Sequence, residues 1–267
     1  MSVAAGGGAS KIDKRKLQMY GIGIGLVGIY LAGILNQALG VSWFSFLAGI
    51  GVIAAVVMGA DAVRRVCAYG IGTGVPSIGM LALGMGMVAA MFALALGKIA
   101  GPIIGVVIAL VFGYFIGFVT NKVIKLNIPV LEECLMDLGG AGAMVLIGLS
   151  VLATGIIDYN VIFNEVINTG YIALIFIIGA LAILHPFNAN LGPDEQQDRT
   201  LSHAVSTGAL AMIAAGIASV GTIGAAGVLT ILIGFVIWIT FYRRFFRLVK
   251  RDASAVVPTG LLPPGGM

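Results

Sequence analysis

The chain has 267 residues, of which 60% are hydrophobic and only 10% charged, with a formal net charge of +4 and a mean hydropathy of +1.10. Soluble domains have about 45–50% apolar and about 25% charged residues, so a single water-exposed fold could not bury this much apolar surface. These values exclude a soluble enzyme, a disordered protein and a disulfide-stapled secreted domain, and they indicate an integral membrane protein.

Apolar runs recur along the whole chain after a small, glycine-rich start and four basic residues. We place them at 17–35, 43–60, 78–97, 99–119, 138–157, 170–184, 204–220 and 223–241. Most have the roughly 17–25 residues that a membrane helix needs, whereas the sixth is short and is expected to begin earlier, near Val161, or to be tilted or broken. Period-two alternation is absent, so the runs predict helices. The expected fold class is an all-α polytopic bundle of about eight transmembrane helices.

The fifteen Lys and Arg residues orient these spans. With eight spans, Lys98 stands alone on one side and the remaining fourteen collect on the other. The basic side is cytoplasmic by the positive-inside rule, and merging the last two runs would move five basic residues outside. The sequence therefore predicts a multi-pass protein of the cytoplasmic membrane with both termini inside. Its parts are a cytoplasmic N-terminal segment (1–16), a transmembrane domain (17–242) and a cytoplasmic C-terminal tail (243–267).

Glycine makes up 40 residues and clusters inside the spans. Three pairs are spaced four apart, which places two bare backbone patches on one helix face and favours close helix packing. These pairs are Gly21 and Gly25, Gly101 and Gly105, and Gly113 and Gly117. Short similarities between the third and fourth spans and the seventh and eighth also suggest a weak internal repeat, which would be parallel.

Ionisable residues inside a membrane usually mark an ion path, but none of the eleven acidic residues falls in the middle of a predicted span. This argues against a self-contained pump with a buried carboxylate relay. Cys67 and Cys134 fall in short polar connections and are expected to be reduced thiols. The outer connection between the fifth and sixth spans is acidic and amide-rich, so it is either a solvated loop or a mouth that attracts cations. It contains Asp158, Asn160, Asn164, Glu165 and Asn168.

A glycine-rich connection leads from two arginines into the third span. Its glycines and proline disfavour a continued helix, so it is either a plain packing turn or a re-entrant loop that lines a cavity. The Walker lysine of a phosphate loop is missing. The candidate cavity-lining residues are Gly72, Thr73, Gly74, Pro76 and Ser77.

The most polar stretch joins the sixth and seventh spans, at 185–200. Asp194, Glu195 and Asp198 offer oxygen ligands for a hard cation such as sodium, and the alternative is a solvated loop that starts a short helix. We include His185 and Asn188 in this candidate ion-pathway or coupling loop, although His185 is better explained as a cap or docking residue than as a proton relay. A further cytoplasmic stretch, 121–137, contains Glu132, Glu133 and Asp137 and is predicted to lie at the interface as a short amphipathic segment.

No catalytic triad, metal-ligand cluster or nucleotide fingerprint is found in the sequence. However, YGIGTGVPSIGM at 69–80 and HPFNANLGPDEQQDRTL at 185–201 resemble the C-subunit family of tetrahydromethanopterin S-methyltransferases of methanogenic archaea, and the resemblance covers the whole chain. It implies a non-catalytic membrane subunit of a complex that moves a methyl group from tetrahydromethanopterin to coenzyme M and extrudes sodium.

The resemblance also implies the partners and cofactors. The corrinoid is expected on a partner subunit, subunits D and E are expected beside this chain, and membrane lipids are expected around it. No cofactor is expected on this chain itself, binding of a sodium ion is left open, and no nucleic acid is expected. Two alternatives stay open: an independent secondary transporter of a small solute or ion, and a purely structural membrane scaffold.

Overall fold

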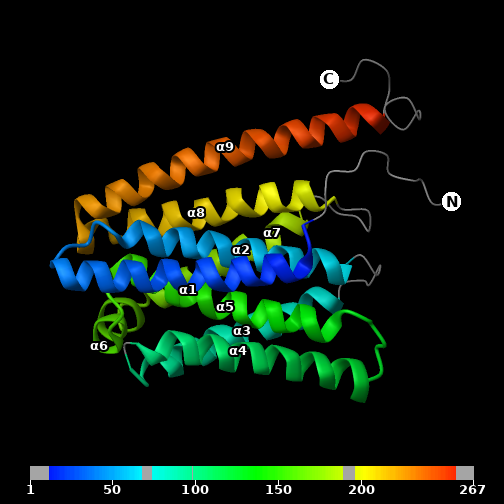
Figure 1. The fold of residues 1–267 in the computed structure, drawn as a ribbon, viewed down its shortest axis with the longest axis horizontal. Helices are drawn as coiled ribbons and strands as arrows, with labels where there is room; N and C mark the ends of the chain where they lie inside the picture. Colours follow the sequence, from blue (N-terminus) through cyan, green and yellow to red (C-terminus); the bar gives the residue numbers. More distant parts are fainter. Residues whose placement is uncertain (1–11, 68–73, 98, 189–195, 257–267) are drawn as a thin grey trace.

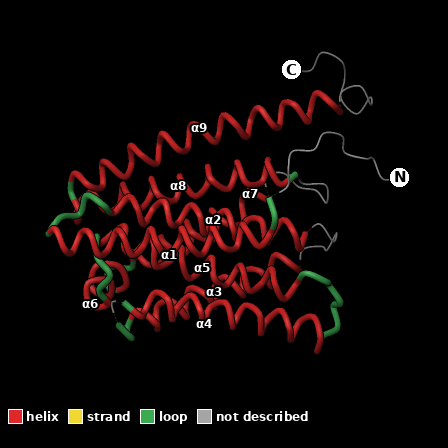
Figure 2. Tube along the Cα trace, viewed as in Figure 1, coloured by secondary structure: helices red, strands yellow, loops and turns green. Residues whose placement is uncertain are grey.

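The computed structural model describes residues 12–67, 74–97, 99–188 and 196–256. These residues form an elongated bundle of long helices that lie roughly side by side (Figures 1 and 2). The helices are α1 (Lys14–Leu39), α2 (Ser45–Cys67), α3 (Gly74–Leu94), α4 (Ala100–Phe118), η1 (Val119–Val123), α5 (Leu131–Thr154), α6 (Tyr159–Ile162), η2 (Phe163–Ile167), α7 (Tyr171–Asn188), α8 (Gln197–Ile223) and α9 (Ala225–Val256). No strand occurs in these ranges, which confirms the all-α class.

Each of the eight predicted apolar runs coincides with a helix of the bundle. Six helices among the described residues are long and apolar enough to cross a membrane. The segments 159–167 and 171–186 reach that length only together, and they are bent by 88° relative to each other. The described apolar part of α3, Met80–Leu94, is shorter. Of the three alternatives for the short sixth run, the structure shows a break just before it, between 167 and 171, while the count of eight crossings stays a prediction.

Both ends of the described chain lie at the same end of the bundle. The backbone of Ile12 exchanges two hydrogen bonds with Gln197, at 2.8 and 3.0 Å, and Arg251 donates to Gln196 at 2.9 Å. The start of α1 and the far end of α9 are thus both next to the start of α8. We call this the basic end and the opposite one the outer end, because the side of the membrane that each faces stays a prediction.

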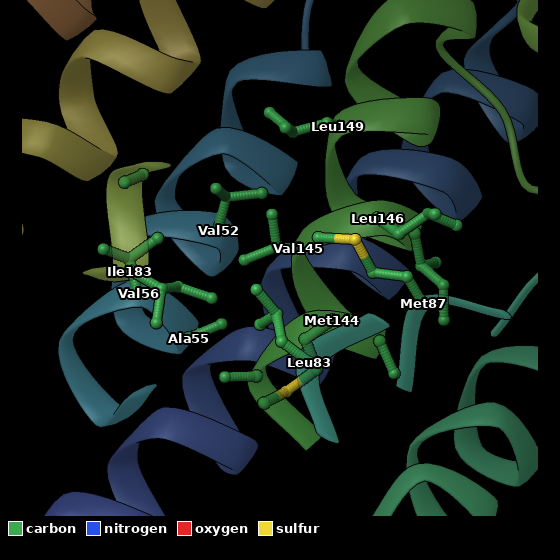
Figure 3. Packing of buried hydrophobic residues seen from close by; sticks show 14 of the residues in the cluster. Val52, Ala55, Val56, Leu83, Met87, Met144, Val145, Leu146, Leu149 and Ile183 are labelled. Carbon is green, nitrogen blue, oxygen red and sulfur yellow. The ribbon is translucent and has the colours of Figure 1, made fainter. Parts of the chain in front are cut away.

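Helix α5 forms the centre of the bundle and packs against α1, α2, α3, α4, α7 and α8. Apolar side chains from α2, α3, α5 and α7 interlock around it (Figure 3). The close approach depends on glycine, as predicted: a Cβ at Gly117 would lie 2.6 Å from the Cα of Glu132, and one at Gly25 would lie 2.7 Å from the sulfur of Met144. Small residues let helices pack where lipid provides no hydrophobic driving force.

Three predictions about helix ends were wrong. Residues 131–137 are the first two turns of α5, not an amphipathic segment at the interface, and Asp137 is fully buried. Cys67 and Cys134 are buried within α2 and α5 rather than in polar connections. At the basic end the helices continue past their apolar stretches because charged side chains from neighbouring helices pair with one another.

Candidate functional site

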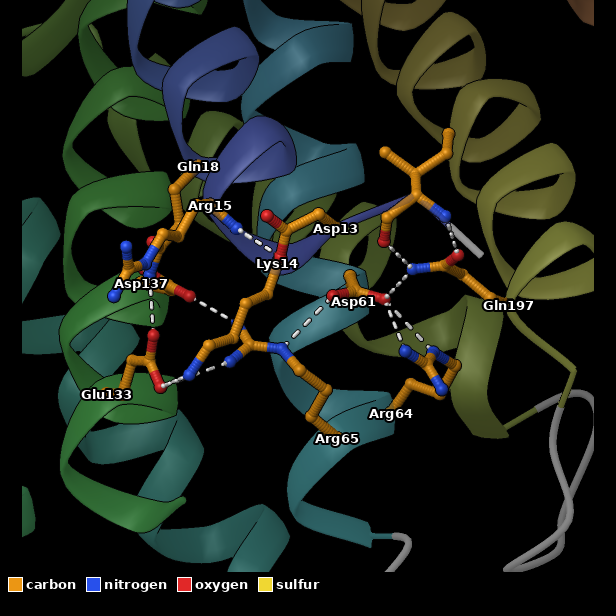
Figure 4. Close-up of polar contacts among 11 residues, drawn as sticks. Asp13, Lys14, Arg15, Gln18, Asp61, Arg64, Arg65, Glu133, Asp137 and Gln197 are labelled. Carbon is orange, nitrogen blue, oxygen red and sulfur yellow. Dashed lines mark hydrogen bonds and ion pairs between the residues drawn. The ribbon is translucent and has the colours of Figure 1, made fainter. Parts of the chain in front are cut away.

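A cluster of charged and amide side chains, buried at its centre and exposed at its margin, lies at the basic end of the bundle (Figure 4). It joins α1, α2, α5 and α8. We call it the charge network, and its members are Lys14, Gln18, Asp61, Arg64, Arg65, Glu133, Asp137 and Gln197. Three acidic and three basic side chains balance, so the network is neutral as a whole.

Asp61 is the acceptor at the centre of one half of the network. Its side chain is 1% exposed. Arg64 donates to Oδ1 from Nε at 3.0 Å and from Nη2 at 2.8 Å, and Arg65 donates to Oδ2 at 3.1 Å. The spacing of three and four residues on α2 brings both guanidinium groups onto the same helix face as the carboxylate. Gln197 adds a donor from α8 at 3.3 Å.

Arg65 connects this half to α5. Its Nη2 donates to Asp137, while its Nη1 lies 3.9 Å from Glu133 and has no hydrogen-bond partner among the described residues. Asp137 also accepts from Gln18 of α1 at 2.8 Å. A single guanidinium group therefore holds carboxylates of two helices, and the planar fork of arginine suits this bridging role.

The outer members of the network attach the start of the chain. Lys14 reaches Glu133 at 2.7 Å, and the side-chain amide of Gln197 pairs with the backbone of Ile12 on both its donor and its acceptor side. The first turn of α1 is thereby fixed to both α5 and α8. A displacement of α1, α2, α5 or α8 at this end would break buried polar contacts.

The chemistry of this network is electrostatic rather than catalytic. Every carboxylate oxygen pair already faces guanidinium, ammonium or amide donors, so little coordination capacity is left for a cation. Within the described ranges, no group of three or more His, Cys, Asp and Glu side chains could hold a metal ion. Removing one partner of a buried ion pair leaves an uncompensated charge, which is strongly destabilising. The network therefore holds α1, α2, α5 and α8 together at this end of the bundle.

None of the described candidate residues of the predicted loop is a member of this network. Asp194 and Glu195 lie outside the described residues. Asp198 is in the first turn of α8, where it pairs with Arg251 of α9 at 3.6 Å. His185 is near the end of α7, with its ring 5.1 Å from that of His203, and Asn188 is the last residue of α7.

Only some of the candidate residues of the glycine-rich connection lie among the described residues. Gly72 and Thr73 lie outside the described residues. Helix α3 already begins at Gly74, so Gly74, Pro76 and Ser77 form the start of a helix rather than a loop. Their role in lining a cavity stays a prediction.

The central residues of the network were missed by sequence reasoning. A local signal existed, since Asp61 precedes Arg64 and Arg65 by three and four residues, the spacing of helical ion pairs. Asp61 directly follows the apolar run 43–60 and so lies just outside the predicted span. Nothing in the sequence indicates that Asp137 of α5 shares Arg65 with it.

Comparison with known proteins decides the family. The sequence model for the C subunit of tetrahydromethanopterin S-methyltransferase matches residues 1–265. The chain belongs to the C-subunit family of tetrahydromethanopterin S-methyltransferases.

Members of this family from several organisms match along their whole length. The tetrahydromethanopterin S-methyltransferase C subunits from Methanosarcina mazei and Methanothermobacter thermautotrophicus are 54% and 39% identical to the chain, each with 98% of both chains covered. The one from Methanopyrus kandleri is 39% identical, with 99% of this chain and 96% of the relative covered. The chain is thus similar to one component of a multi-subunit methyltransferase, and other components of that complex are its partners. Its long apolar helices make it a membrane protein.

Proposed function

We propose that this subunit forms part of the membrane sector of the methyltransferase complex, in the cytoplasmic membrane, and that this sector couples methyl transfer to sodium extrusion. The observation that supports the proposal is the charge network. It links four helices at the end where the basic residues collect, and that end would face the soluble reactants. Its polar contacts hold in one arrangement of the four helices and would break in another, and an element that transmits a conformational change needs contacts that differ between two states.

The chain would share the ion path rather than contain it. The described acidic side chains are all near one end or the other of the bundle. The buried ones, Asp61 and Asp137, form ion pairs with arginine side chains. A sodium ion crossing the membrane needs oxygen ligands along its way. Partner subunits, of which D and E are the expected ones, would supply the missing ligands, and a corrinoid-carrying subunit would perform the methyl transfer.

The helix surfaces support contact with such partners. Large apolar side chains are exposed along α4 and α9, among them Val111, Phe115, Leu232, Phe235 and Val236. Lipid and neighbouring membrane subunits are the two environments in which such surfaces are stable.

The test uses the whole complex in proteoliposomes that are supplied with methyl donor and coenzyme M. Methyl transfer and uptake of radioactive sodium are measured together, so that their ratio reports coupling. In Asp137→Asn we expect methyl transfer to continue while sodium moved per methyl group falls several-fold, because Arg65 loses its charged partner on α5. The matched control is Glu132→Gln, which removes one charge from the same helix outside the network.

The outcomes separate the alternatives. A wild-type complex that transfers methyl groups without sodium uptake would refute the sodium function. An unchanged ratio in assembled Asp137→Asn complex would leave the network as a scaffold. Asp194→Asn and Glu195→Gln are tested in the same assay, and unchanged sodium dependence of methyl transfer would remove both residues from the mechanism.

A further inference from the structure

A cavity of about 460 Å³ opens at the outer end of the bundle, away from the charge network. Its wall is formed by the last turn of α5, the break between η2 and α7, and the last turns of α8. The lining contains five hydroxyl groups and one carboxylate, and no Lys, Arg or His. These side chains are Thr154, Glu165, Thr169, Tyr171, Ser219 and Thr222.

The hydroxyl groups of these side chains already donate their protons to the backbone. Each donates its proton to a backbone carbonyl: Thr154 to Ser150 at 2.9 Å, Thr169 to Glu165 at 2.8 Å and Ser219 to Gly216 at 3.0 Å. Tyr171 and Thr222 donate to the carbonyls of Ala215 and Ser219 at 3.3 and 3.2 Å. A hydroxyl whose proton is already engaged can only accept or coordinate. The lining is therefore rich in acceptors and poor in free donors, which favours a cation over an anion.

Glu165 provides the charge. It is exposed, and no described residue forms an ion pair with it, in contrast to the carboxylates of the charge network. A single carboxylate neutralises one monovalent cation. A divalent cation would keep an excess charge, since calcium sites in proteins use several carboxylates.

The backbone at this place is also unusual. Glu165 belongs to the π-helix η2, which ends before Gly170, a residue with φ of +77°, and α7 then leaves at 88° to the preceding segment. Single-turn π segments occur often at functional sites, and helices broken within the membrane are a recurrent way of presenting oxygen ligands to ions. Thr169 lies in the break and Tyr171 is the first residue of α7, and both line the cavity.

We propose that this cavity binds a monovalent cation, with Glu165 as the charged ligand and the surrounding hydroxyl groups as neutral oxygen ligands. The proposal rests on the proposed function for the identity of the ion: sodium is the cation that the membrane sector would deliver to this end. The cavity would then be the outer vestibule of the sodium path.

The experiment follows access to the cavity with a cysteine reporter in the intact complex in lipid nanodiscs. Ala218→Cys places a thiol in the lining without replacing an oxygen ligand. The native Cys67 and Cys134 are buried, so they are protected from a methanethiosulfonate reagent. The labelling rate is measured in sodium, lithium, potassium, magnesium and choline chloride at equal ionic strength. We expect sodium to slow labelling several-fold relative to choline, and magnesium to have little effect.

The same reporter is then combined with Glu165→Gln, which should abolish protection by sodium. Glu132→Gln at the opposite end is the charge-matched control and should leave protection intact. Gly221→Cys serves as a second reporter if Ala218→Cys does not assemble, because a Cβ at Gly221 would meet no atom within 4 Å and no oxygen ligand is replaced. Equal rates in sodium and choline, or protection that survives Glu165→Gln, would overturn the proposal.

Failure of this proposal can be distinguished from failure of the proposed function. Sodium uptake by the wild-type complex without protection of either reporter would refute the cavity site alone. Protection without any methyl-driven sodium uptake would refute the proposed function, and the cavity would remain a cation site.

Discussion

The two ends of the bundle use polar side chains in opposite ways. At the basic end, the carboxylates of Asp61 and Asp137 are buried and paired with guanidinium groups of α2, while α1 and α8 add ammonium and amide donors. At the outer end, neutral amide and hydroxyl groups bond to the backbone, and the charged residue of the cavity, Glu165, has no ionic partner among the described side chains. Charges that are paired with each other hold helices together, whereas a charge left facing a cavity is available to a ligand.

At the outer end, an uncharged side chain holds three helices together. Asn36 of α1 donates to the hydroxyl of Ser45 at 3.0 Å and to the carbonyl of Gly155 at 2.8 Å, and accepts from the backbone of Phe44 at 2.9 Å. One amide thus ties α1, α2 and α5 together. This tie therefore joins three helices without adding a net charge to the outer end.

The largest effect is expected at the centre of the charge network. Arg65→Met leaves Asp137 without its guanidinium partner, and breaking a buried ion pair costs about 3–5 kcal/mol. We expect a pronounced fall in the thermal midpoint of the complex, measured as loss of the assembled peak in size-exclusion chromatography after heating. The double variant Arg65→Met, Asp137→Leu removes the orphaned charge and should recover part of the loss. If Arg65→Met had the same thermal midpoint as the wild type, the charge network would not stabilise the bundle.

The next largest effect is expected at the uncharged tie of the outer end. Asn36→Ala leaves the buried hydrogen-bonding groups of Ser45, Phe44 and Gly155 without this partner, at a cost of about 1–3 kcal/mol. The same heating assay should show a smaller fall than for Arg65→Met. Unlike that variant, Asn36→Ala should be insensitive to salt, since no ion pair is lost. Asn160→Ala, an exposed amide at the same end, is the control and should behave like the wild type.

A small effect is expected at the margin of the charge network. The ion pair between Lys14 and Glu133 has side chains that are 46% and 30% exposed. Exposed pairs contribute about 0–1 kcal/mol and are screened by salt. Lys14→Ala should therefore lower the thermal midpoint slightly at low ionic strength and not at high ionic strength. A loss as large as that of Arg65→Met would mean that the network is one cooperative unit up to its edge.

The smallest effect on stability is expected in the cavity. Glu165→Gln removes an exposed charge with no ionic partner among the described residues, and surface substitutions of this kind are usually within ±0.5 kcal/mol. The thermal midpoint should not change in choline. In sodium, the wild type should be stabilised relative to Glu165→Gln, because a ligand that binds the folded state raises its stability. Equal midpoints of the two proteins in sodium would contradict cation binding at this residue.

The sequence by itself determined the class of this protein and the position of its helices. Apolar runs of membrane length are a local property, and each of them coincides with a helix. The glycine pairs likewise predicted close packing, since the absence of a side chain is local information. The short sixth run indicated that this span starts earlier, is tilted or is broken, and the structure shows the bend between the segments 159–167 and 171–186.

Only the tertiary structure decided which polar residues act together. Asp61 and Asp137 stand 76 positions apart and share Arg65, and the cavity around Glu165 is assembled from three separate helix ends. The sequence shows a carboxylate and its near neighbours along the chain, but the energy of a charge depends on its partners in space and on its exposure to water. The partners and the exposure are fixed only when the helices pack. Packing buries Asp137 against Arg65, and it leaves Glu165 in the wall of a cavity without an ionic partner among the described residues.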